Sequence, residues 1–370
     1  MSIAKEQRIS EFDEFFQREK NNSVSVMVNI RNPIRFPVMP FFLLKNESIL
    51  SSEFIVNRKK NWLRKLCLKI GYLASIFEQL DRCLFNRVEF SFSDHKVVVP
   101  IDAYHNYRTL NRNIINFRNG NEPELACLLD LLVPDDGVFV DIGCNWGYFS
   151  FYLLTRASFR GQVFSFEPEP DSFAELSTLK RALGDRAKNL KTFQVACGDR
   201  DTNESFFVHS NKQSSSLRLN WEELEPNLFE KRIDVQVRRL DSYGISNLSL
   251  LKIDVEGFEH ECFRGCVQTV SESRPYIFIE SHVGDDIPHD SGLAVLNEIQ
   301  SLGYQFYLPA WIQDNGTFFV GISATASMSR LSLVPFEPKD RLSFGIGILN
   351  VFAVPNELVP VVAKRFSGRG

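Results

Sequence analysis

The chain has 370 residues, of which 44% are hydrophobic and 24% charged; these are ordinary globular values and exclude global disorder. Its length allows two domains, or one large domain with an extension. The net charge of −4 is uneven, because residues 1–120 carry 19 Lys and Arg against 12 Asp and Glu, which is +7 and leaves −11 for the rest. We attribute this modest basic excess to a solvated surface. No dense basic patch is interleaved with aromatic residues, so a nucleic-acid partner is not expected.

The N-terminus is charged and amphipathic and lacks the apolar core of a signal peptide. No run reaches the roughly 18 apolar residues that a membrane span needs. The seven cysteines are scattered and odd in number, which favours reduced, buried thiols over a disulfide framework. Cys262 and Cys266 lie one helical turn apart, but no second Cys or His pair follows at zinc-like spacing, so we expect core residues. These features indicate a cytoplasmic protein.

Apolar residues at helical spacing predict amphipathic helices over 3–20 and 58–80, and hence a helical N-terminal extension over 1–86. The opposite face of the helix at 58–80 is rich in Lys and Arg. Such a helix can lie on a membrane surface, although it more often packs on a domain with its charges in water. Period-two alternation over 87–101 then predicts a hairpin, so that 87–122 would hold this hairpin and a linker.

From residue 123 to 370 strands alternate with helices, which predicts βαβ units and a mostly parallel sheet covered on both faces. Helices are expected over 122–133, 148–157, 171–183 and 291–304, with another beginning near residue 258. Strands are expected over 138–142, 161–168, 190–199, 249–257, 274–282, 304–309 and 348–355. The ligand cleft of such a sheet lies at the carboxyl ends of its strands.

The stretch VFVDIGCNWG is a strand, a turn and the start of a helix, with Asp141, Gly143, Asn145 and Gly147 in the turn. Its spacing differs from the G-x-G-x-x-G of a dinucleotide site, where a pyrophosphate would lie over the helix N-terminus. An acid at this place suits a ligand with a cationic part. S-adenosylmethionine, with an ammonium and a sulfonium, therefore fits better than NAD. A plain turn with incidental glycines is the alternative.

The next strand, in VFSFEP, ends at Glu167. A carboxylate at this place typically accepts hydrogen bonds from the ribose hydroxyls of a nucleoside, whereas a solvated turn glutamate is the alternative. Further on, FQVACGD ends in small residues from Ala196 to Asp199, which would leave room for an adenine ring.

Acids gather after the strand that ends at Ile253, where Asp254, Glu256 and Glu259 fall within six positions. Crowded acids are costly unless a cation or a proton is shared. Glu256 and Glu259 can also serve as acids at a helix N-terminus. The following strand ends with Glu280 and His282, and a histidine at such a place is a candidate general base.

The series VFVDIGCNWGYFS, VFSFEPEP, FQVACGDRD, SSSLRL, RRLDSY, LLKIDVEGFEHECFRG and RPYIFIESH resembles the FkbM-type family of S-adenosylmethionine-dependent methyltransferases. The match covers about residues 120–282, and ILNVFAVP extends it to about 356. The resemblance implies a class I methyltransferase (Rossmann-like) fold: a seven-stranded, mostly parallel sheet with helices on both faces and an antiparallel last strand. It also implies S-adenosylmethionine as methyl donor and, usually, O-methylation of a sugar or another small hydroxylated metabolite.

Carried over by position, the resemblance assigns one group of residues to the methionine end of the cofactor: Asp141, Gly143, Asn145 and Gly147. Glu167 would hold the ribose; Ala196 and Asp199 are expected near the adenine from the small residues of their own stretch. Asp254 and Glu256 match the family's signature acids near the reacting methyl. Cys144 stands where the family usually has alanine, and residues 1–85 find no counterpart.

An acceptor hydroxyl must lose its proton as it attacks the methyl group. His282 or Asp254 could take this proton, or a divalent metal held by Asp254 with Glu280 or His282 could acidify the hydroxyl. We favour the route without a metal. A methyltransferase-like binding module without catalysis is the alternative function.

The acceptor itself is not disclosed by these motifs, because acceptor pockets are built from loops and extensions. The candidate segments are 1–120, 209–232 and 309–345. A saccharide or small-molecule acceptor is expected, or a membrane-proximal glycan if the helix at 58–80 docks on lipid.

Overall fold

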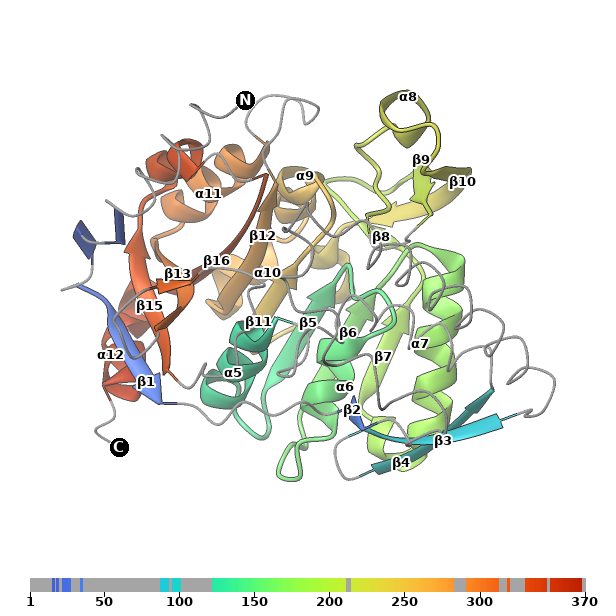
Figure 1. Ribbon diagram of the computed structural model, residues 1–370, viewed down its shortest axis with the longest axis horizontal. Coiled ribbons are helices and arrows are strands. Elements are labelled where there is room, and N and C mark those ends of the chain that lie inside the picture. The colour runs from blue at the N-terminus through green and yellow to red at the C-terminus, as the bar shows by residue number, and fades with distance from the viewer. Residues whose placement is uncertain are drawn as a thin grey trace, which may run out of the picture.

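The computed structural model of the chain (Figure 1) describes residues 15–16, 18–19, 22–27, 34–35, 87–92, 95–100, 122–210, 214–282, 291–312, 318–319, 330–344 and 347–367. The helix expected over 58–80 lies outside these residues. Of the helix expected over 3–20, four residues are described, and all four are helical.

The centre of the fold is a mixed sheet in the order β1-β15-β13-β16-β12-β11-β5-β6-β7, with β14 paired to β13. Five neighbouring strands are parallel: β5 (Val138–Ile142), β6 (Gln162–Phe166), β7 (Leu190–Phe193), β11 (Leu248–Ile253) and β12 (Tyr276–His282). The strand β16 (Ile348–Pro355) runs antiparallel to both of its neighbours, β12 and β13 (Tyr304–Ile312). These are the seven strands expected from the sequence.

The sheet as described has ten strands rather than seven. Beyond β13 it is extended by β15 (Arg330–Phe336), β14 (Phe318–Phe319) and β1 (Val24–Met27). The edge strand β1 comes from the segment expected to be helical, so part of that segment belongs to the main sheet.

Helices cover both faces of the sheet (Figure 1). One face packs against α5 (Pro123–Leu132), α6 (Tyr148–Leu154), α7 (Pro170–Leu183) and α12 (Val359–Phe366). The other face packs against α9 (Glu259–Arg264), α10 (Val267–Ser273) and α11 (Ser291–Ser301). Successive side chains of a strand point to opposite faces, so Phe139 enters the first core and Val140 the second, both fully buried. The expected Rossmann-like layering is confirmed.

The strand expected over 190–199 is broken in two. After β7 the chain forms β8 (Ala196–Cys197), which pairs in parallel with β10 (Phe229–Arg238) instead of with the main sheet. The amide of Gly198 donates to the carbonyl of Arg238 at 3.0 Å and continues this pairing. With β9 (Thr202–His209), these strands make a small sheet at the upper right of Figure 1, next to the short α8 (Trp221–Leu224).

The hairpin expected over 87–101 is present as β3 (Arg87–Phe92) and β4 (His95–Pro100), with β2 (Ile34–Arg35) beside β3. Fully buried Val97 and Val99 of β4 join the core under α7. Four 3-10 turns are also described: η1 (Gly184–Ala187), η2 (Leu240–Tyr243), η3 (Pro338–Phe344) and η4 (Asn356–Leu358).

The described cysteines are buried and free of disulfides, Cys262 and Cys266 among them. In the part of the chain that the structure describes, no helix is long and apolar enough to cross a membrane.

Candidate active site

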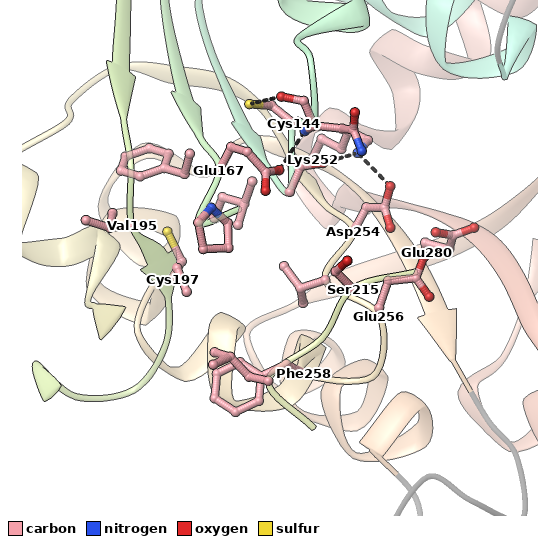
Figure 2. A pocket seen from close by; sticks show the side chains of 18 of the residues that line it. Cys144, Glu167, Val195, Cys197, Ser215, Lys252, Asp254, Glu256, Phe258 and Glu280 are labelled. Atoms are coloured by element: carbon pink, nitrogen blue, oxygen red, sulfur yellow. Dashed lines mark hydrogen bonds and ion pairs between the residues drawn. The ribbon is translucent and has the colours of Figure 1, made fainter. Parts of the chain in front are cut away.

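A cavity of about 220 Å³ opens at the carboxyl ends of β5, β6, β11 and β12 (Figure 2). Its described wall carries five carboxylates and one ammonium: Glu122, Glu167, Asp254, Glu256, Glu280 and Lys252. Asp254, Glu256 and Glu280 gather on one side, while Val195 and Cys197 form part of another. Burial raises the pKa of several of these acids, and a ligand that carries positive charge would favour their ionised form, so the wall suits such a ligand.

The turn after β5 forms one edge of the cavity. Gly143 has φ 71°, and a Cβ there would lie 1.7 Å from the carbonyl oxygen of Asp254, so only glycine allows the ends of β5 and β11 to approach this closely. Asn145 also takes a left-handed conformation, with φ 50°, and its Oδ1 accepts a hydrogen bond from the amide of Trp146 at 2.8 Å. Gly143 and Asn145 both line the cavity.

Glu167 lies on the wall directly after β6. Its Oε2 accepts from the amide of Asn145 at 2.8 Å and its Oε1 accepts from the amide of Glu169 at 2.9 Å. Burial raises the pKa of Glu167 to about 8, although the two amides oppose this shift. Each oxygen keeps a second lone pair for a further donor.

Lys252 pairs with two acids at the inner wall of the cavity. It was not among the site residues predicted from the sequence. Its Nζ lies 2.9 Å from Oδ2 of Asp254 and 3.8 Å from Oδ1 of Asp141. Burial lowers the pKa of Lys252, but the charges of Asp254 and Asp141 outweigh burial and raise it, so the ammonium stays charged. A single lysine inside an apolar strand, β11, was the signal for such a buried pair.

Three predicted cofactor residues lie away from the wall. Asp141 is buried beneath the turn, where its Oδ2 accepts from the hydroxyl of Ser150 at 2.6 Å, so it acts on Lys252 rather than facing the cavity. Gly147 begins α6 with φ 89°, and a Cβ there would lie 2.5 Å from Leu176, so it serves helix packing. Asp199 does not reach the cavity, and its Oδ2 lies 3.6 Å from Nη1 of Arg264. Ala196, by contrast, lines the cavity.

Asp254 and Glu280 lie side by side on the wall and hydrogen-bond to each other. Burial and the charge of Asp254 raise the pKa of Glu280 well above its usual range. Burial alone would raise the pKa of Asp254, but Lys252 and the hydrogen bond with Glu280 lower it to about 2. The ionised form of Asp254 is therefore favoured, and its charge favours the protonated form of Glu280.

His282 lies behind this wall, 3% exposed, between two carboxylates. Its Nδ1 is 2.9 Å from Oε1 of Glu259, and its Nε2 is 3.2 Å from Oε2 of Glu256. Burial would lower the pKa of His282, but these carboxylates outweigh it and raise the pKa to about 12. In this form the ring is an imidazolium with no lone pair to accept a proton, so the predicted role of His282 as general base is not supported.

Glu256 and Glu259 begin the turn into α9. Glu256 lines the cavity in a left-handed conformation, with φ 50°. Glu259 accepts a hydrogen bond from the amide of Gly257 at 2.9 Å, as an acid at a helix N-terminus does, and also holds His282.

Two further parts of the wall were not assigned from the sequence. Glu122, at the N-terminus of α5, has φ 36° and a buried Oε2 without a hydrogen-bond partner among the described residues. Burial raises the pKa of Glu122 to about 8. Ser215 and Leu217 reach the wall from the connection between β9 and β10, inside the candidate acceptor segment 209–232. The hydroxyl of Ser216 donates to the carbonyl of Glu256 at 2.6 Å and fastens this connection to the site.

The motifs that shape this cavity fall inside a region known from other proteins, because residues 136–306 match the model of the methyltransferase FkbM domain. The match covers β5 to the start of β13, which includes the strand ends that carry most of the cavity wall. The resemblance inferred from the motifs is thereby confirmed.

Two curated relatives align with part of the chain. The 2-O-methyltransferase NoeI of Sinorhizobium fredii (strain NBRC 101917 / NGR234) is 29% identical over 167 residues, 41% of this chain and 66% of NoeI. The antimetabolite synthetase AmbE of Pseudomonas aeruginosa is 26% identical over 191 residues, 41% of this chain and 9% of AmbE. The chain thus spans just under two thirds of NoeI and a small part of AmbE, so the likeness is that of a domain.

Among solved structures, the methyltransferase FkbM from Methylobacillus flagellatus KT aligns over 64% of this chain and 59% of that chain. The TM-score is 0.36 and the sequence identity 14%.

Proposed function

We propose that the chain is an S-adenosylmethionine-dependent O-methyltransferase whose acceptor is a hydroxyl of a sugar, a glycan or another small metabolite. The observation that carries this proposal is the acidic cavity, with five acids against one lysine, whose wall lies mostly within the residues that match the methyltransferase FkbM domain. Such a wall complements a cationic cofactor. The name of the relative NoeI, a 2-O-methyltransferase, supports transfer to oxygen.

The wall residues fit S-adenosylmethionine in kind and in order. The free lone pairs of the Glu167 carboxylate suit the ribose hydroxyls, and the turn at Gly143 and Asn145 would hold the methionine end. Val195 and Ala196 offer a small apolar surface for the adenine. When bound, the cofactor supplies an electrophilic methyl group on a sulfonium.

The chain's own task is to position the acceptor and to take its proton. Glu122 suits this task best, because it lies on the wall with an oxygen free of hydrogen bonds to the described residues and has a pKa of about 8. A base works best when its pKa lies near the working pH. Asp254 is ionised but bound to Lys252 and Glu280, so it would orient the acceptor hydroxyl by accepting a hydrogen bond.

The test is methyl transfer from labelled S-adenosylmethionine to a panel of saccharides and small polyols, with the product identified by mass spectrometry and NMR. We expect a methyl ether, and Glu122→Gln should lower kcat by about 10²- to 10⁴-fold. Glu298→Gln, in a partly buried pair with His260 at 3.0 Å outside the cavity, is the matched control and should retain activity. Transfer to nitrogen or carbon would contradict the proposal, and cofactor binding without turnover would favour a binding module.

A further inference from the structure

Three side chains at and directly behind the cavity wall present metal-binding atoms to one another. One ligand atom each from Glu256, Glu280 and His282 lies within 4.8 Å of the other two. Nε2 of His282 is 3.2 Å from Oε2 of Glu256 and 3.9 Å from Oε2 of Glu280. Ligand atoms that share a cation at about 2.1 Å are about 3 to 4 Å from one another, so this spacing suits a common ion.

The orientation of His282 is a second, separate observation. Glu259, which is fully buried, fixes the ring through Nδ1 at 2.9 Å and is itself held by the amide of Gly257. Nε2 is thereby aimed at Glu256 and Glu280, and it is buried without a hydrogen bond to any described residue. A carboxylate behind one ring nitrogen, with the other nitrogen turned toward further ligand atoms, is how proteins orient metal-binding histidines.

We propose that Glu256, Glu280 and His282 bind a divalent cation at the wall of the cavity, with Glu259 positioning the histidine. Two carboxylate oxygens and one imidazole nitrogen suit ions such as Mn²⁺ or Zn²⁺. Cation binding displaces the protons that the His282 ring and the Glu280 carboxyl carry otherwise. Asp254 belongs to its pair with Lys252 and is not a ligand, which changes the ligand set expected from the sequence.

The coordination positions of the cation that these three residues leave open would face the cavity, because Glu256 and Glu280 both line it (Figure 2). An acceptor with two neighbouring hydroxyls could fill these positions, and the cation would acidify the hydroxyl that attacks. The acceptor class is then a vicinal diol. This role in catalysis rests on the proposed function, whereas cation binding itself does not.

The test is a titration of the full chain with Mn²⁺ alone, followed by the electron paramagnetic resonance signal of free Mn²⁺. We expect one Mn²⁺ per chain, with affinity lowered at least about tenfold in Glu256→Gln, in Glu280→Gln and in Glu259→Gln. Glu298→Gln removes the carboxylate of another His–Glu pair, at 3.0 Å from His260, and should bind Mn²⁺ like the wild type. Glutamine has nearly the same shape as glutamate, so these variants should keep the fold, and circular dichroism checks that they do.

The proposal is overturned if Mn²⁺ does not bind saturably, or if Glu256→Gln and Glu280→Gln bind it as tightly as Glu298→Gln. The catalytic role is measured separately, as loss of methyl transfer in EDTA and its return with Mn²⁺. Unchanged transfer in EDTA overturns that role. Mn²⁺ binding without transfer to any acceptor leaves the cation site standing and counts against the proposed function instead.

Discussion

Gly143 allows the backbones of β5 and β11 to meet under the cavity, and its replacement tests this contact. In Gly143→Ala the new Cβ would lie 1.7 Å from the carbonyl oxygen of Asp254, so the strand ends must separate. We expect a loss of about 3 kcal/mol or more in the free energy of unfolding, measured by urea denaturation. Gly244→Ala is the matched control: its φ of 60° and ψ of 35° are left-handed, but nothing lies within 4 Å of the added Cβ. It should cost about 1 kcal/mol, and equal losses at the two sites would refute the contact.

Individual site residues were predictable from the sequence where a strand end fixed their place. Gly143, Asn145, Glu167 and Asp254 reach the wall because they directly follow parallel strands. Asp141 does not, because the last residues of a strand alternate between faces and Lys252 draws its carboxylate inward. The sequence could not place Glu122, because it lies at the N-terminus of α5, outside the strand-end motifs, and reaches the wall only through the packing of that helix.

At the scale of elements, the sequence pattern located the main helices and strands after residue 122. Apolar residues recur with one period in helices and with another in strands, so each kind of element can be told from the other. The break between β7 and β8 was not predictable. The apolar pattern of this segment is continuous, and its division depends on a partner, β10, that lies more than 30 residues further along the chain. Pairing between distant strands leaves no local signal.

Arg274 joins the ends of several elements, and its partner Glu357 gives this junction a pH dependence. Arg274 donates to both carboxylate oxygens of Glu357 at 2.8 Å and to the carbonyl of Gly303 at 3.1 Å. The hydrogen bonds from Arg274 are the main reason that the pKa of Glu357 falls from 4.5 to about 2. The folded state therefore binds this proton less readily than the unfolded state. The contribution of Glu357 is fully present above about pH 4.5 and is lost as the pH falls through about 2.

We expect Glu357→Gln to lower the free energy of unfolding at pH 6 by up to about 1 kcal/mol, a modest value because the pair is partly exposed. The difference from the wild type should shrink between pH 4.5 and pH 2, as followed by urea denaturation at several pH values. Glu272→Gln is the control, because the partner of Glu272 is the neutral amide of Gln268 at 2.9 Å. A difference that stays constant down to pH 2 would show that the ion pair with Arg274 is not its source.

At the scale of the whole molecule, β1 from the N-terminal part of the chain and α12 from its C-terminal part meet at one edge of the sheet. Strand β1 pairs with β15, more than 300 residues later in the sequence, and packs beside α12 (Figure 1). The sequence predicted an extension separate from the core, because four residues of β1 carry too short a pattern to reveal their partner. The main sheet thus has more strands than the seven expected. The cavity lies near the middle of the sheet, at the ends of β5, β6, β11 and β12.

Ligand binding at that central cavity should stabilise the whole domain, which provides a test of the cofactor independent of the acceptor. S-adenosylhomocysteine, at about 100 times its Kd, should add about 2.7 kcal/mol to the free energy of unfolding. For a domain of this size we expect Tm to rise on the order of 5 to 10 °C, measured by differential scanning fluorimetry. Glu167→Gln should reduce this rise in Tm. The side-chain NH2 of glutamine would face one of the two backbone N–H groups that now donate to the carboxylate of Glu167. NAD is the control ligand, and a rise with NAD equal to that with S-adenosylhomocysteine would argue against a site selective for the sulfonium cofactor.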